Sequence, residues 1–337
     1  MAPVRRAIAL LVLVVGLLPL TWLQTPPSKR EFQLGMVEFR RIPLPDPGHL
    51  TSLGPFTLER AWQMSSTWTR FGSYSGLIAY SDQRLLAVSD FGNYLEFSPP
   101  DTRGPAPKGG GAFAHPLAFK ELRDYEAATM DPATGTIWIA TEYANAIQRF
   151  APEWQLNGTF KPHAMRDWPS NTGPEALTRL HDGRFIVVRE GTGGDQAPGA
   201  MPDGGHQAIL FARDPIEGMR GALLFTLEGP RHFSAVDMAT MPDGRVLVLF
   251  RKLIWPMPQR FAARIAIGDP GEIRQGQPWK LRTLARINST LPVDNFEGLA
   301  IAPRKDGTLT IWLISDDNRS NFQKTLLWKL RLDPASV

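Results

Sequence analysis

Carboxylates recur at two fixed places in a pattern that this sequence repeats. In each copy an apolar run begins beside a polar or acidic residue, a short turn follows, and a second apolar run ends on a charged residue. Three copies have an acid at both places, as the pairs Glu126 and Glu142, Glu175 and Glu190, and Glu297 and Asp316. Paired acids at a repeated spacing are the residue types that metal binding and acid–base chemistry require.

Two copies depart from this rule. The first begins at Ser75 and ends on Asp90, so it has one acid. The fourth has Val236 where the others have Glu, places Asp237 one residue later, and ends on Arg251. The departure of the fourth copy puts a complete ring of metal ligands in doubt.

Carboxylates that gather at one place disfavour one another's ionisation, so protons, arginines or cations must neutralise them. Arg189, Arg251 and Arg319 are near in sequence but too few, which predicts a bound divalent cation. The chain has no Cys and no His pair at metal spacing, so oxygen ligands favour Ca²⁺, with Mg²⁺ or Mn²⁺ as alternatives. A single acid at a strand end is often a solvated surface residue, but recurrence in five copies favours a site. The predicted ligands are Asp90, Glu126, Glu142, Glu175, Glu190, Glu297, Asp316 and Asp317.

The repeated pattern also predicts the elements that position these acids. Two apolar runs joined by a tight turn form a β-hairpin, and three of the turns are Asp-Gly, at Asp182, Asp243 and Asp306. A third apolar run follows in each copy, and the copies start about 50 to 60 residues apart, which is typical of propeller blades. We predict an all-β fold, a single β-propeller of five or six four-stranded blades. Phe56–Met64 is the predicted strand that closes the ring; a degenerate sixth blade is the alternative.

The predicted topology brings the acids together. In an antiparallel hairpin the start of the first strand lies beside the end of the second. Because all blades of a propeller point the same way around its axis, the two recurrent positions must lie on one face, near the central channel. About eight carboxylates are therefore expected at one mouth.

The N-terminus predicts export. Arg5 and Arg6 precede an apolar run from Ala7 to Leu20, extended by Trp22 and Leu23. A positive end followed by such a run is typical of an export signal. We interpret residues 1–25 as a signal peptide or membrane anchor and residues 31–337 as the propeller. The predicted location is periplasmic or extracellular, either free or anchored to the inner membrane by residues 7–23.

Composition and motifs exclude several other classes. The formal charge of the 337 residues is only +4, without a basic run interleaved with aromatics, so no nucleic-acid partner is expected. Absence of Cys excludes thiolate sites and Cys nucleophiles. The sequence has no Gly-x-Ser-x-Gly, P-loop or His-Glu-x-x-His motif.

At the acidic positions the chain resembles a known family, the phytase-like proteins described by "esterase-like activity of phytase". The resemblance runs from about Ser75 to Leu332 and is most specific near the end. It is carried by Asp124-Tyr125-Glu126-Ala127, Pro174-Glu175-Ala176-Leu177 and Asp294-Asn295-Phe296-Glu297-Gly298-Leu299-Ala300, with Ser315-Asp316-Asp317-Asn318 and Gln323-Lys324-Thr325-Leu326-Leu327.

The resemblance implies a propeller that hydrolyses phosphoesters with metal held by the recurrent acids. The matching acids are Glu126, Glu142, Glu175, Glu190, Glu297, Asp316 and Asp317. Glu175, Glu297 and Arg251 are the candidate catalytic residues, because an arginine at that place can grip a phosphate bidentately. The expected partner is a small-molecule substrate, for which the resemblance implies a phosphorylated compound, and the chain is expected to be a monomer.

Two alternatives stay open at this point. One is a calcium-dependent lactonase-type propeller with a single axial metal, for which Glu297, Asn318 and Asp316 would be ligands. The other is a non-catalytic propeller that binds a ligand or partner, since propellers host many functions. A cluster of several metals favours the phosphoesterase, one axial metal favours the lactonase, and arginine–carboxylate pairs that fill the mouth favour the binding protein.

Overall fold

The computed structural model describes residues 6, 11–13, 36–102, 109–113, 124–191, 205–254 and 260–337. Apart from residues 11–13, the predicted export segment lies outside the described residues. Among the residues described, no helix is long and apolar enough to cross a membrane.

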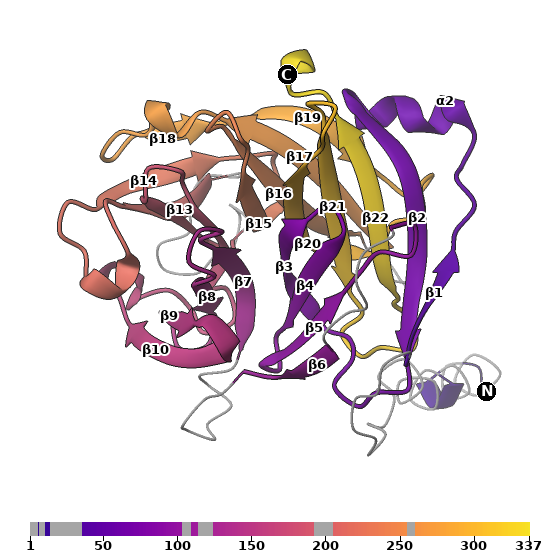
Figure 1. The fold of residues 1–337 in the computed structure, drawn as a ribbon, viewed down its shortest axis with the longest axis horizontal. Helices are drawn as coiled ribbons and strands as arrows, with labels where there is room; N and C mark the ends of the chain where they lie inside the picture. The colour runs from indigo at the N-terminus through magenta and orange to yellow at the C-terminus, as the bar shows by residue number, and fades with distance from the viewer. Residues whose placement is uncertain are drawn as a thin grey trace.

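The described strands form five antiparallel sheets around a common centre, with β3, β7, β15 and β20 near the middle and β1, β10 and β14 towards the outside (Figure 1). This confirms the all-β propeller and fixes the blade number at five. The first strand of every blade is innermost, and each inner strand contacts the next in the ring order β3, β7, β11, β15, β20.

The first three blades follow the chain. Blade one consists of β3 (Tyr74–Ser81), β4 (Arg84–Ser89), β5 (Asn93–Phe97) and β6 (Gly109–Ala112). Blade two consists of β7 (Tyr125–Met130), β8 (Ile137–Thr141), β9 (Ala146–Ala151) and β10 (Gln155–Phe160). Blade three consists of β11 (Pro174–Arg179), β12 (Phe185–Arg189), β13 (Gly205–Phe211) and β14 (Leu223–Glu228).

The last two blades complete the ring. Blade four consists of β15 (Ser234–Thr240), β16 (Val246–Ile254), β17 (Arg260–Gly268) and β19 (Arg282–Ile287). Between β17 and β19 the chain crosses to blade three, where β18 (Pro278–Lys280) pairs in parallel with β14. Blade five consists of β20 (Asn295–Pro303), β21 (Leu309–Asp316), β22 (Thr325–Leu332), β2 (Phe56–Ser66) and β1 (Val37–Arg41).

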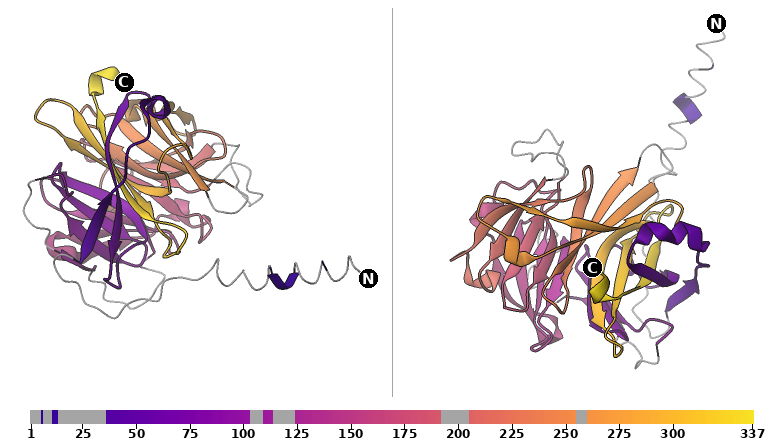
Figure 2. Two further views of the ribbon diagram at one scale, coloured as in Figure 1. Left: turned by 90° about the vertical axis from the view of Figure 1, so that its right-hand side faces the viewer. Right: turned by 90° about the horizontal axis from the view of Figure 1, so that it is seen from above.

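The ring closes by pairing the two ends of the domain. The N-terminal strand β2 is hydrogen-bonded to the C-terminal strand β22, from Phe56 beside Leu332 to Met64 beside Thr325, and the two lie side by side in the ribbon (Figures 1 and 2). The prediction that Phe56–Met64 closes the ring is therefore confirmed. The described chain from residue 36 to 73 supplies β1, β2, a short helix and a 3₁₀ turn rather than a sixth blade, because its strands join the sheet of blade five.

From residue 36 onwards, the helical structure among the described residues consists of single turns in the connections. These are α2 (Pro47–Leu50) and the 3₁₀ turns at Thr51–Leu53, Pro152–Trp154, His163–Met165, Pro215–Glu217, Pro270–Glu272 and Pro334–Ser336. Proline begins most of them, as expected where its fixed φ suits a first helical residue.

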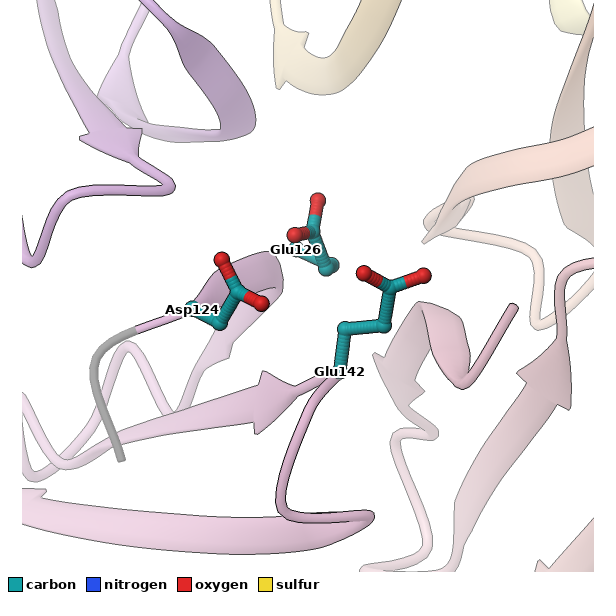
Figure 3. Close-up of side chains that lie close together, drawn as sticks. All are labelled: Asp124, Glu126 and Glu142. Carbon is teal, nitrogen blue, oxygen red and sulfur yellow. The ribbon is translucent and has the colours of Figure 1, made fainter. Parts of the chain in front are cut away.

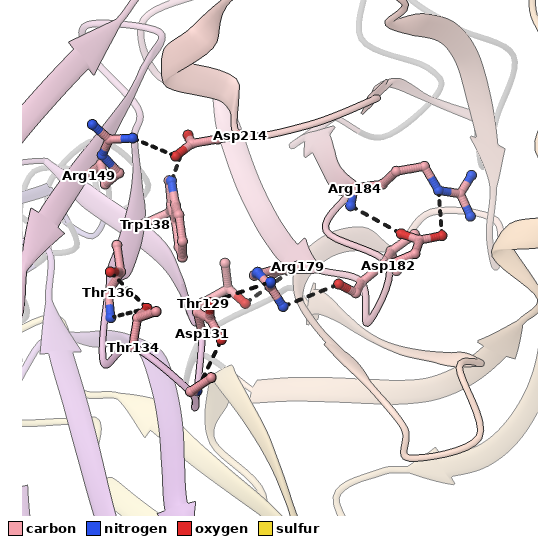
Figure 4. Close-up of polar contacts among 12 residues, drawn as sticks. Thr129, Asp131, Thr134, Thr136, Trp138, Arg149, Arg179, Asp182, Arg184 and Asp214 are labelled. Carbon is pink, nitrogen blue, oxygen red and sulfur yellow. Dashed lines mark hydrogen bonds and ion pairs between the residues drawn. The ribbon is translucent and has the colours of Figure 1, made fainter.

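The core consists of five apolar clusters, one at each interface between neighbouring blades. Between blades four and five, for example, Leu247 and Leu249 of β16 pack with Leu313 and Trp328. This arrangement explains why the second strands are apolar on both faces, since each face packs against a different blade. Polar ties reinforce the interfaces: Asp214 of blade three accepts hydrogen bonds from Trp138 Nε1 (2.8 Å) and Arg149 Nη1 (2.7 Å) of blade two (Figure 4).

Candidate metal site at the mouth of the propeller

Every inner strand has a β-bulge at the same place near its start. The register shifts leave one residue of each strand without a partner in the second strand. A bulge re-aims the extra side chain relative to the regular alternation of the strand. The five bulge residues are Ser75, Glu126, Glu175, Val236 and Glu297.

The second strands bring further acids to the same level. The backbone N–H of Glu142 donates to the carbonyl of Asp124 (2.9 Å), and that of Glu190 donates to the carbonyl of Gly173 (2.8 Å). Asp90 makes the same bond to Ser73 (3.0 Å). Each second strand therefore ends beside the residue two positions before the bulge, which confirms that the hairpin geometry gathers these acids at one mouth.

The carboxylates of blades two and three form two overlapping groups. Asp124, Glu126 and Glu142 form the first, and Glu142, Glu175 and Glu190 form the second; within each, one carboxylate oxygen per residue lies within 4.8 Å of the others. The carboxylates of the first group lie close together (Figure 3). Because Glu142 belongs to both, the two groups form one continuous acidic surface.

Glu126 lacks a counterion in this surface. Its side chain is buried, with 9% of its area exposed, and it has no hydrogen bond or ion pair among the described residues. Burial raises its pKa well above the usual value, and the charges of Asp90 and Glu142 raise it further. A buried carboxyl without a partner costs free energy, so it must carry a proton or contact a cation.

The neighbouring glutamates Glu142 and Glu175 also have raised pKa values. Burial raises the pKa of Glu142 to about 7, against the effect of a hydrogen bond with Glu175 and with the help of the charge of Glu190. Burial likewise raises the pKa of Glu175 well above its ordinary range, and Glu126 and Glu190 add to the effect. In the described chain, none of Glu126, Glu142 and Glu175 forms an ion pair with a basic side chain.

Blades one and five extend the surface. Burial raises the pKa of Asp316 well above its usual value, and the charges of Glu297 and Asp90 increase the shift. Burial also raises the pKa of Asp90, with contributions from Glu297 and Asp124. Since these acids act on one another, the structure brings together Asp90, Glu126, Glu142, Glu175, Glu190, Glu297 and Asp316.

Arg251 occupies the corresponding place in blade four. Its Nη2 lies 2.8 Å from Oε1 of Glu190, and its Nη1 lies 3.3 Å from Oε1 of Glu297 and 3.0 Å from Oδ1 of Asn295. Burial works to lower the pKa of Arg251, but the charges of Glu297 and Glu190 outweigh it and raise that pKa. The guanidinium therefore neutralises one side of the mouth, next to Glu297, one of the other candidate catalytic residues.

Asp317 and Asn318 lie beside the surface and have other partners. Asp317 accepts hydrogen bonds from the backbone of Ser73 (3.1 Å) and from Thr325 Oγ1 (2.8 Å), which ties blade five to the start of blade one. Asn318 donates from Nδ2 to Gln323 (2.7 Å). Their roles as metal ligands stay predictions.

Two polar residues of the mouth were not among the predicted site residues. Asp124 belongs to the first carboxylate group, and Asn295 bridges Arg251 and Glu297 by accepting from one and donating to the other (2.8 Å). Both stand two residues before a bulge glutamate, so the signal was present in the sequence. Regular alternation places both residues of each pair on one face of the strand. The repeated pattern singles out the glutamate, and nothing in it assigns the earlier residue to the site as well.

These residues fit a bound cation of the oxygen-preferring kind. The donors are carboxylates alone, several are buried, and Glu126 has no protein partner in the part of the chain described. Hard divalent cations such as Ca²⁺ take six to eight oxygen ligands, and their charge reverses the pKa pattern that crowding produces.

Fold and site together define a five-bladed propeller whose inner-strand bulges line one mouth with carboxylates. Residues 69–319 match the family model "Phytase-like: Esterase-like activity of phytase". The chain belongs to this phytase-like family.

Several solved structures are similar to this chain at low identity. A virginiamycin B lyase from Staphylococcus aureus is 11% identical with a TM-score of 0.40, covering 88% of this chain and 99% of the other. The XC5397 gluconolactonase from Xanthomonas campestris is 14% identical with a TM-score of 0.40, covering 92% and 99%. A chain of a nidogen/laminin complex is 8% identical with a TM-score of 0.43, covering 82% and 97%. No curated protein sequence matches this chain.

Proposed function

We propose that the acidic mouth is the active site of a metal-dependent hydrolase of phosphate esters. The observation that supports this most is the pair of overlapping carboxylate groups that share Glu142, with the partnerless Glu126 in the first. Two adjoining oxygen-ligand groups suit a cluster of cations better than a single axial ion. The substrate would be a small phosphorylated molecule, and the protein would act as a monomer in the periplasm or outside the cell.

The cation would be held by Asp124, Glu126, Glu142, Glu175 and Glu190, with Asp90, Glu297 and Asp316 beside them. When bound, Ca²⁺, or else Mg²⁺ or Mn²⁺, would supply charge stabilisation for phosphoryl oxygens and a more acidic water.

The protein's own part is to orient the substrate and to move protons. Arg251 presents a guanidinium at the edge of this surface, and a guanidinium can bind two phosphate oxygens at once. Asn295 and Glu190 hold that guanidinium in place, so its position does not depend on the substrate. Among the bulge carboxylates, Glu297 and Glu175 raise the pKa of Arg251 through their charges. This suits them to exchange a proton with an ester that Arg251 binds, or with water.

The first experiment measures binding of Ca²⁺, Mg²⁺ and Mn²⁺ to the purified full chain by calorimetry. A Glu126→Gln/Glu142→Gln variant should lose most of the affinity. A Glu228→Gln/Glu272→Gln variant removes two exposed acids elsewhere and should bind as the wild type does. Wild type that binds none of the three cations would exclude a metal-dependent hydrolase of either kind.

Activity is measured next on aryl phosphate mono- and diesters and on a lactone. Hydrolysis of a phosphate ester that requires the cation and is lost in Glu126→Gln/Glu142→Gln would support the proposal. Cation-dependent lactone hydrolysis without phosphatase activity would favour the lactonase. Cation binding without either activity would favour a binding propeller.

A further inference from the structure

A second cavity lies outside the mouth, between blades four and five. It has a volume of about 680 Å³ and is bounded by the outermost strand β1, the start of β17 and the segments that precede β20 and β22. We call it the flank cleft. It shares no residue with the two carboxylate groups of the mouth.

The flank cleft is strongly basic. Arg40, Arg41, Arg260 and Lys324 line it, all four are exposed, and none forms an ion pair among the described residues. Arg40 donates from Nη2 to Oε1 of Gln63 (2.6 Å), which uses one of its five N–H donors and leaves its charge uncompensated.

Among the described residues, one acid lines the flank cleft, and both of its carboxylate oxygens already accept hydrogen bonds. Asp294 is buried, and its two oxygens accept hydrogen bonds from the backbone N–H groups of Asn295 (2.9 Å) and Lys324 (3.0 Å). Its role is to hold the two segments in place, so it offsets at most one of the four positive charges. The cleft therefore keeps an excess of positive charge facing solvent.

Apart from Gln63 and Ser289, the rest of the described lining is apolar. Phe261, Leu291 and Leu326 are buried in the wall, and Ile42 and Val293 are partly buried. Phe322 also lines the flank cleft, with 55% of its area exposed, two residues before Lys324 in the chain. An exposed aromatic ring beside several unpaired cations fits a ligand with both an apolar part and a negative charge.

We propose that the flank cleft binds an amphipathic anion, a phosphate or phosphonate head group attached to an apolar group. The arginines and Lys324 would contact the head group, because guanidinium groups bind its oxygens in pairs. The apolar group would cover Phe322 and the adjoining wall. A soluble phosphorylated metabolite and an acidic phospholipid share this chemistry.

The test is a calorimetric titration of the purified full chain with benzylphosphonate, whose carbon–phosphorus bond the proposed hydrolase does not cleave. EDTA is present throughout, so cations at the mouth contribute nothing. Benzylphosphonate should bind more tightly than inorganic phosphate, and binding should weaken with added salt. Arg40→Gln/Arg41→Gln should weaken it about tenfold or more, since each charged hydrogen bond is worth roughly a factor of ten.

The matched control is Lys280→Gln/Arg282→Gln, which removes two exposed charges of the same sign outside the cleft and should leave the affinity within about twofold. Phe322→Ser should reduce the preference for benzylphosphonate over inorganic phosphate. Wild type that does not bind, or Arg40→Gln/Arg41→Gln that binds equally well, would overturn the proposal. Equal affinity for inorganic phosphate and benzylphosphonate would overturn the part of the proposal that assigns an apolar group to the ligand.

Competition separates the two sources. Monomeric dihexanoyl phosphatidic acid that displaces benzylphosphonate at a lower concentration would identify a phospholipid. If displacement requires a higher concentration of dihexanoyl phosphatidic acid than of benzylphosphonate, the ligand is a soluble anion. Both results support binding in the flank cleft. Absence of benzylphosphonate binding in EDTA would not argue against the metal-dependent function proposed for the mouth.

Discussion

Arg251 of blade four donates from Nη2 to Oε1 of Glu190, the last residue of the corresponding hairpin in blade three, across 2.8 Å. It stands where the other four blades end their second strand in a carboxylate. The mouth is therefore asymmetric: the guanidinium neutralises Glu190 and Glu297, whereas Glu126, Glu142 and Glu175 form no ion pair with a basic side chain among the described residues. This asymmetry decides what each of the following changes should do.

Arg251→Gln should destabilise the metal-free protein by about 2–3 kcal/mol, because it leaves the buried Glu297 and the partly buried Glu190 without their counterion. Calcium should restore part of this loss if the vacated place can bind a cation. The measurement is denaturant unfolding at pH 7 with EDTA and with calcium.

Arg184→Gln is the control for Arg251→Gln. It breaks an exposed ion pair with Asp182 (2.8 Å) and should cost less than about 1 kcal/mol, equally with and without calcium. A loss in Arg251→Gln no larger than this would show that Arg251 does not stabilise the mouth.

The stability of the metal-free protein should fall as the pH rises from about 4.5 to about 7. Burial raises the pKa of Glu142 from 4.5 to about 7, so in this window the folded state holds a proton that the unfolded chain has released. The folded state then binds more protons, and its free energy of unfolding decreases with pH. Glu59 has the opposite tendency, since the hydrogen bond from Arg304 lowers its pKa, but it acts below pH 4.5. Burial lowers the pKa of His206 to about 4, which opposes the trend up to about pH 6.5, and the raised pKa values of Asp294, Glu126 and Glu175 outweigh it.

Urea unfolding at pH 5, 6, 7 and 8 measures this slope. With EDTA the free energy of unfolding should decrease across the series, and with calcium the decrease should be smaller because a cation favours the ionised carboxyls. Glu142→Gln should flatten the EDTA series. A metal-free stability that rises between pH 5 and 7 would contradict the assignment of crowded, protonated carboxyls.

Asp317→Asn should lower stability more than metal affinity. Both carboxylate oxygens of Asp317 accept hydrogen bonds, including those from the Ser73 backbone and Thr325, and a charged acceptor strengthens each bond. We expect a loss of about 1–3 kcal/mol. Calorimetry should show a smaller loss of calcium affinity than Glu126→Gln causes; an equal loss would establish Asp317 as a ligand.

Much of the fold follows from local pattern. The hairpins, their Asp-Gly turns and the closing strand could be predicted because each depends on neighbouring residues or on the need to pair a free edge. The crossing of β18 to blade three could not, because Pro278–Lys280 has too few residues to show a strand pattern and its pairing with β14 is tertiary.

The sequence predicts which acids converge at the mouth. It does not predict which of them form hydrogen bonds or ion pairs. Recurrence at fixed spacing located Glu126, Glu175 and Glu297, whereas the bulge that re-aims them is a property of two strands and of the blades on either side. For the same reason the sequence offered Arg251 as a ligand for phosphate without showing that Glu190 and Glu297 already hold it.

Gly298→Ala tests whether the packing behind the bulge positions Glu297. A Cβ at Gly298 would lie 2.5 Å from Cγ2 of Ile314 and 3.0 Å from Cβ of Leu77, so the inner strand must shift away from its neighbours. We expect a loss of about 1–3 kcal/mol and, since Glu297 is the preceding residue, altered calcium affinity. Gly48→Ala adds the same methyl group where nothing lies within 4 Å and should change stability by less than about 0.5 kcal/mol. If Gly298→Ala keeps wild-type stability and calcium affinity, the position of Glu297 does not depend on this close contact between blades one and five.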